Sequence, residues 1–183
     1  MTYSEICAAV DRMNDKYRVS DPFELCSEMC IILLPKPLGT APNAIKGFFL
    51  EIKRIKTITV NSDLPQIIQK IIVAHEIGHA ALHHRSGIHA FHEVAMFDES
   101  SDMEREANLF AAEFLLRDDE VFETLNSDTT FFTAAAKLYV PIELLDFKFR
   151  IMKWKGYKMI EPPILANSNF LRDMEVPKNV EYN

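Results

Sequence analysis

Residues 63–84 read DLPQIIQKIIVAHEIGHAALHH and contain the pattern H-E-x-x-H, which begins at His75 and ends at His79. Apolar residues recur through this stretch with the spacing of a helix. On a helix, side chains four residues apart lie on the same face, so both imidazoles of the pattern can reach one small cation. Glu76 lies beside that face, where its carboxylate can deprotonate a water molecule at the cation. The pattern therefore predicts metal-assisted hydrolysis at the end of a long helix.

The composition is that of an ordinary globular protein, with 183 residues, of which 48% are hydrophobic and 26% are charged. The formal net charge of −7 argues against a general affinity for nucleic acid or anionic lipid. The first residues do not resemble a secretory signal, and no apolar stretch is long enough to span a bilayer. We therefore expect a cytoplasmic protein with no membrane partner.

The three cysteines are odd in number and lack C-x-x-C spacing, which favours reduced thiols. A metal pair formed by Cys26 and Cys30 is one interpretation. Two buried thiols on a helix agree better with the usual behaviour of free cysteine.

The remaining elements predict an α+β fold, in which a small N-terminal sheet packs against a mostly helical, zincin-like domain. Asp63 followed by Gln66 predicts a capped beginning for the long helix that carries the H-E-x-x-H pattern. We expect helices over residues 4–17, 63–84, 101–116 and 141–155, shorter helices from Asp21-Pro22, Asp118-Asp119 and Thr129 or Thr130, and strands over residues 31–34, 48–53 and 56–60. Residues 85–99 are expected to be mainly loop, and the tail from Tyr157 is expected to be poorly ordered or to pack as an extended segment.

Two histidines do not complete a catalytic zinc site, which uses three protein ligands and water. A metzincin would place a third histidine six residues beyond His79, but that position is Arg85. The candidates that remain for the third ligand are His83, His84, His89, His92, Glu99, Glu104 and Glu106.

Glu104 and Asn108 are the preferred pair, because they lie four apart and share one face of the next expected helix. Glu104 can bind the metal, and Asn108 can accept a hydrogen bond from the outer nitrogen of a ligating histidine. Glu106 lies about 200° around the helix, so only one of the two glutamates can face the metal. Ser101 followed by Glu104 also fits a capping box, which would make Glu104 part of a helix cap.

These two stretches together resemble the ImmA/IrrE family of metallo-endopeptidases. The similar motifs are HEIGHAALH at residues 75–83 and EREANLFAAEFLL at residues 104–116, with ITVN at residues 58–61 as a similar lead-in strand. The resemblance covers residues 45–150. We therefore predict a single metallopeptidase domain over residues 1–156, followed by a C-terminal tail over residues 157–183.

The resemblance implies that His75, His79 and Glu104 bind one catalytic Zn²⁺, for which Mn²⁺ could substitute, and that Glu76 is the general base. His83, His92 and Tyr139 are candidates for a further contact to the substrate or the transition state. The resemblance also implies site-specific cleavage of a helix-turn-helix transcriptional repressor, in a mobile element, a prophage or a stress response.

Two other functions remain open from the sequence. Residues 129–155 form a helix-turn-helix-like segment that is locally basic, which would suit a DNA-binding regulator. The alternative for this segment is a packed helical hairpin, since its apolar residues have the spacing of a core. The third possibility is a protein-interaction module that keeps the metal as a structural element, although such a site needs no base like Glu76.

Overall fold

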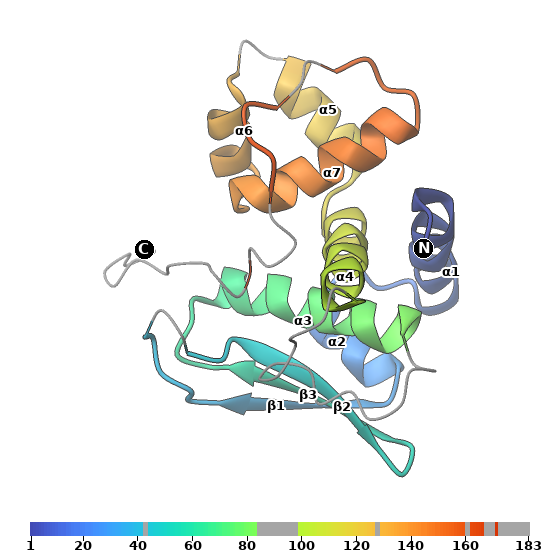
Figure 1. Cartoon of the computed structure of the whole chain (residues 1–183), viewed down its shortest axis with the longest axis vertical. Coiled ribbons are helices and arrows are strands. Elements are labelled where there is room, and N and C mark those ends of the chain that lie inside the picture. The colour runs from blue at the N-terminus through green and yellow to red at the C-terminus, as the bar shows by residue number, and fades with distance from the viewer. Residues whose placement is uncertain (42–43, 84–98, 127–128, 160–161, 167–170, 172–183) are drawn as a thin grey trace.

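The computed structural model describes residues 1–41, 44–83, 99–126, 129–159, 162–166 and 171 of the chain. In this part, helices and one sheet follow each other in an α+β arrangement, as predicted (Figure 1). The elements are α1 (Tyr3–Tyr17), α2 (Pro22–Glu28), β1 (Ile31–Lys36), β2 (Gly47–Ile52), β3 (Ile55–Asn61), α3 (Gln66–Leu82), α4 (Glu99–Leu115), α5 (Asp118–Asn126), α6 (Phe131–Lys137) and α7 (Ile142–Trp154). The expected loop over residues 85–99 lies outside the described residues, except for Glu99 at the start of α4.

The sheet has the strand order β1-β3-β2, with β1 parallel and β2 antiparallel to the central strand β3. Ile58 of β3 lies between Leu33 and Phe49 in the register, and α3 packs along the sheet (Figure 1). Ile58 and Phe49 are buried. β1 continues through Pro35, where a strand end was predicted, because an edge strand tolerates a residue without an N–H.

The predicted cap at Asp63 is wrong, and the alternative cap at Ser101 does not fit the helix boundary. Helix α3 begins at Gln66 after Pro65, and the Asp63 carboxylate instead accepts a hydrogen bond of 2.7 Å from the backbone N–H of Gly39. Helix α4 begins at Glu99, so Ser101 lies inside the helix and does not cap it. The capping role considered for the glutamate three residues later is therefore excluded.

The beginning of α3 is held by the buried carboxamide of Asn61. Its Nδ2 donates to the carbonyls of Gly39, at 2.7 Å, and Ile45, at 3.0 Å. Its Oδ1 accepts from the backbone N–H of Leu38 and of Asp63. Asn61 is fully buried, so these bonds fix the loops that join the sheet to α3 and with them the direction of that helix.

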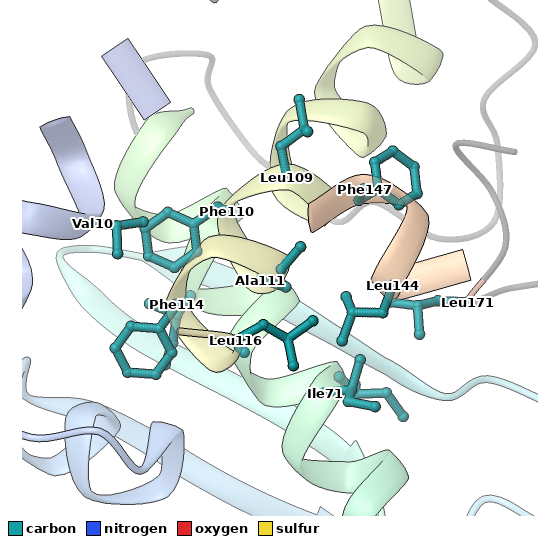
Figure 2. Close-up of a cluster of buried hydrophobic side chains, with 14 of the residues drawn as sticks. Val10, Ile71, Leu109, Phe110, Ala111, Phe114, Leu116, Leu144, Phe147 and Leu171 are labelled. Atoms are coloured by element: carbon teal, nitrogen blue, oxygen red, sulfur yellow. The ribbon is translucent and has the colours of Figure 1, made fainter. Parts of the chain in front are cut away.

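One hydrophobic cluster connects α3, α4 and α7. Leu109, Phe110 and Ala111 of α4 are fully buried, and they lie in the same cluster as Ile71 of α3 and Leu144 of α7 (Figure 2). Helices α5, α6 and α7 lie beyond α4, away from the sheet (Figure 1). Among the described helices, none is long and apolar enough to cross a membrane.

Part of the C-terminal tail packs as an extended segment. The Asp146 carboxylate of α7 accepts a hydrogen bond of 2.9 Å from the backbone N–H of Ala166, and Arg150 donates one of 2.8 Å to the Ala166 carbonyl. Ala166 and Leu171 are both buried. The rest of the tail beyond these residues lies outside the described part of the chain.

A buried ion network joins α4, α5 and α7. Lys148 has 1% of its side chain exposed, and its Nζ lies 2.6 Å from Glu113 Oε2 and 2.5 Å from Asp118 Oδ1. Lys155 contacts the other oxygen of each carboxylate, at 2.6 and 2.7 Å. Burial opposes the charged form of Lys155, but the two carboxylates outweigh it and raise its pKa. The two carboxylates therefore balance the charge of the buried Lys148 and of Lys155, which lies at the surface end of the network.

Candidate metal centre

The two histidines of the H-E-x-x-H pattern and one glutamate of α4 converge on a single point. His75 Nε2 lies 3.0 Å from His79 Nε2. The Glu104 carboxylate lies 3.2 Å from the first of these nitrogens and 3.3 Å from the second. One ligand atom of each residue lies within 4.8 Å of the others, as a metal ion needs. Two imidazoles and a carboxylate are the donors that a catalytic zinc ion prefers.

This convergence depends on a close approach of α3 and α4. A Cβ placed on Gly78 would lie 3.2 Å from the Cα and the carbonyl oxygen of Ala107 and from Cβ of Phe110. At this position Gly78, which has no side chain, packs directly against the backbone of Ala107. Gly78 lies between the two histidines in sequence, so this close packing of the helices occurs beside the candidate ligands.

Gly78→Ala is expected to weaken metal binding and to lower the free energy of unfolding by about 1–3 kcal/mol, the usual range for overpacking. The added methyl group meets backbone atoms of α4, which cannot rotate away, so the helices must separate. Zinc titration and thermal unfolding measure the two effects. Since alanine favours a helix over glycine by about 1 kcal/mol, a stabilised variant with unchanged zinc affinity would contradict the close packing.

Asn108 lies at the outer nitrogen of His75. Asn108 Oδ1 is 2.8 Å from His75 Nδ1, and Asn108 is fully buried on α4. A carboxamide oxygen can only accept, so the hydrogen of His75 is on Nδ1. The lone pair of His75 Nε2 is then directed at the point where Glu104 and His79 meet.

Electrostatics favour a cation at this point. Burial lowers the pKa of His75, but the carboxylates of Glu104 and Glu76 outweigh burial, so that its pKa is raised. Burial likewise opposes the charged form of Glu104, and the two imidazoles outweigh it and hold the pKa of the carboxyl well below its usual range. The carboxylate that favours a proton on His75 also favours a divalent ion in its place, since metal binding displaces protons from its ligands.

Glu76 is 2% exposed and lies on α3 beside His75. A Cβ on Gly47 would lie 3.8 Å from Glu76 Oε1, so the beginning of β2 runs close to this carboxylate. Glu76 therefore lies between the cluster of His75, His79 and Glu104 and the edge strand β2.

His83 and Glu106 form a buried pair beside the cluster. His83 Nδ1 lies 3.1 Å from His79 Nδ1, and His83 Nε2 lies 2.9 Å from Glu106 Oε2. The other oxygen of Glu106 contacts the α-amino group of Met1. Glu106 thus points away from the three converging residues, in agreement with its place on the helix. The sequence predicted a substrate contact for His83, and this pairing with Glu106 was missed.

Of three other residues from the sequence analysis, Tyr139 and Cys30 do not join this cluster, and His92 is not described. Tyr139 lies in the turn between α6 and α7 with 72% of its side chain exposed, and no described contact connects it to the histidines. His92 lies outside the described residues. Cys30 follows α2 and is exposed, so the expectation of two buried helix thiols is wrong for this residue. Cys26 is buried, which raises its pKa to about 12 and keeps it a protonated thiol.

Comparison with known proteins agrees with this geometry. Residues 26–150 match the model of the peptidase family M78, described as the IrrE N-terminal-like domain. The chain belongs to this family. The chain is also similar to "Uncharacterized immunity region protein 2" of Bacillus phage phi105, with 38% identity over 146 residues, or 80% of this chain and 90% of the relative. No solved structure matches the chain. Membership of the M78 family confirms the resemblance stated from the sequence and supports a metallopeptidase-type function.

The M78 match also covers most of the segment that was considered for DNA binding. Three of its five basic side chains, those of Lys148, Arg150 and Lys155, form ion pairs within the protein. The apolar residues of α7 are buried, as expected of a packed hairpin. Little of the local positive charge is left for phosphate contacts, which disfavours the DNA-binding interpretation.

Proposed function

We propose that this protein is a zinc-dependent endopeptidase that makes site-specific cuts in a partner protein. The observation that supports the proposal is the convergence of His75, His79 and Glu104, with Glu76 next to them. In this proposal the three converging residues are the protein ligands of one catalytic Zn²⁺, and Mn²⁺ is a possible substitute.

The chemistry divides between the ion and the side chains. A zinc ion at such a site lowers the pKa of water from about 15.7 toward 7 and polarises the scissile carbonyl. Glu76 would accept the proton of the attacking water and pass it to the leaving amine. Asn108 would hold His75 in the tautomer that presents Nε2, because its oxygen lies 2.8 Å from Nδ1.

The outer strand β2 suits an extended peptide substrate. Among the described residues, β2 pairs on one side only, with β3, and its first residue Gly47 lies close to Glu76. A peptide that adds to the free side of β2 would gain backbone hydrogen bonds along the strand. Its backbone would then run past Glu76, where the attacking water is activated.

The substrate that we propose is a helix-turn-helix repressor of a mobile element, prophage or stress response. The resemblance to the ImmA/IrrE family implies this substrate class, and the matched phage relative is named for an immunity region. Cleavage between the DNA-binding part of a repressor and the rest would release its target genes.

The experiment that tests this function uses a purified helix-turn-helix repressor from the genome that encodes the protein. Incubation with the purified protein and Zn²⁺ or Mn²⁺ is expected to give two fragments, whose masses identify one scissile bond. EDTA is expected to prevent the cut, and added Zn²⁺ to restore it, because removal of the ion removes the polarising charge. A repressor that stays intact with metal-loaded protein, or a cut that persists in EDTA, would contradict the proposal.

A further inference from the structure

A second pair of ionisable side chains lies directly behind the candidate metal centre. His83 follows His79 by one helical turn on α3, and Glu106 of α4 approaches it from the other side. The side chains of His83 and Glu106 are each 8% exposed, and they lie 2.9 Å apart. Neither belongs to the three residues that converge on the ion site.

The contact between the two histidines fixes where their hydrogens lie. The two Nδ1 atoms are 3.1 Å apart, so one of them must donate and the other accept. A histidine that offers Nε2 to a cation carries its hydrogen on Nδ1. His79 is then the donor, and His83 accepts on Nδ1 and carries its own hydrogen on Nε2.

The contact on the far side of His83 agrees with this assignment. His83 Nε2 lies 2.9 Å from Glu106 Oε2, and a carboxylate can only accept. Every hydrogen therefore points from His79 through His83 to Glu106. Reversing the first hydrogen bond would put the His79 hydrogen on Nε2, where it faces the site of the ion.

We infer that His83 and Glu106 are a positioning pair, which holds the ring and the tautomer of His79 so that its Nε2 lone pair faces the ion. The inference rests on the proposed function for the identity of the site and goes beyond it. His75 is held by a single carboxamide, whereas His79 is held by a neutral imidazole with a carboxylate behind it. Outer partners of this kind orient metal ligands and raise their basicity.

The test measures zinc affinity, which does not depend on catalysis. His83→Leu and Glu106→Leu are each expected to weaken zinc binding about 10- to 100-fold in a chelator competition. His83→Gln is expected to recover most of the affinity, because its amide oxygen can accept the His79 hydrogen. For these measurements a purification tag is placed at the C-terminus, because the α-amino group of Met1 contacts Glu106.

The double variant shows whether the two residues act in series. If Glu106 acts only through His83, the two losses of zinc affinity do not add. The double variant His83→Leu/Glu106→Leu then has the same zinc affinity as the single variant that binds zinc less tightly. Ile77→Val is the matched control, because it removes one buried methyl group from the same helix and leaves both members of the pair unchanged. This control is expected to lose stability and keep the zinc affinity.

The outcomes separate this inference from the proposed function. Leucine variants with wild-type zinc affinity, in a protein that cleaves its substrate, would overturn the positioning pair alone. A wild-type protein that binds zinc and cleaves no repressor would overturn the proposed substrate, while weaker binding by the variants would still support the pair. A wild-type protein that binds no zinc would overturn both.

Discussion

Glu76→Gln is expected to bind zinc as tightly as the wild type and to lose about 10²- to 10⁴-fold of the cleavage rate, the usual contribution of a general base. The amide has nearly the same shape as the carboxylate but cannot accept the proton of the attacking water. Because Glu76 is not one of the three converging residues, the ion site keeps its donors. The variant therefore separates binding of the metal from the chemistry.

The measurement combines metal analysis of the dialysed protein with the rate of repressor cleavage under single-turnover conditions. Glu123→Gln, an exposed position on α5, makes the same chemical change away from the site and is expected to behave as the wild type. A Glu76→Gln protein that cleaves at the wild-type rate would remove Glu76 from the mechanism. An interaction module with a structural ion would instead be favoured if the wild-type protein cleaves no partner and Glu76→Gln leaves its function in the cell intact.

Glu104→Ala is expected to lose both the ion and the activity. Two imidazoles remain after this change, and the carboxylate that balances the charge of the ion is gone. We expect zinc affinity to fall by more than about 100-fold, since the loss of outer partners alone costs about 10- to 100-fold. Chelator competition measures the affinity, and the cleavage assay measures the activity.

Asp102→Ala is the matched control for this variant. Asp102 lies on the same helix with 81% of its side chain exposed, and it pairs with Arg105 at 3.7 Å. It is expected to keep both zinc and activity, so a general effect of charge on α4 is excluded. Full zinc occupancy and full activity in Glu104→Ala would show that a different residue completes the site.

The sequence predicts the fold where local patterns determine the structure. The predicted bounds of α2, α3, α4 and β3 agree with the observed bounds to within a few residues. These predictions come from the apolar spacing of the long helices, from the alternation in the strand, and from the cap and proline at the start of α2. The cap predicted at Asp63 is wrong, because this polar side chain has another partner in the tertiary structure. Asp63 binds the backbone of a loop that lies 24 residues earlier, which no local rule contains.

In the candidate site, too, local spacing predicts one part of the structure, and tertiary packing determines the other. Spacing alone places His75 and His79 on one face, and it orients Glu104 and Glu106 to different faces of the next helix. It does not show that Gly78 packs directly against the backbone of Ala107, because this depends on how two helices cross. The pattern does offer a sign of the positioning pair, since His83 follows His79 by four residues, as His79 follows His75.

The basic segment over residues 129–155 shows why counts of charge mislead. Lys148 pairs with Glu113, which lies 35 residues earlier in the chain. Only the packing of α7 against α4 makes this lysine part of the interior. A sequence shows that a lysine is present, and its partner must be found in three dimensions.

The donors of the candidate centre come from two separate helices, and this arrangement has a consequence for the life of the protein in the cell. An ion held by both α3 and α4 acts as a cross-link, and its binding free energy adds to the free energy of unfolding. Chains that lack the ion unfold more often and are exposed to degradation. The supply of metal would thus set how much of this protein the cell contains, as well as how fast each molecule cleaves its substrate.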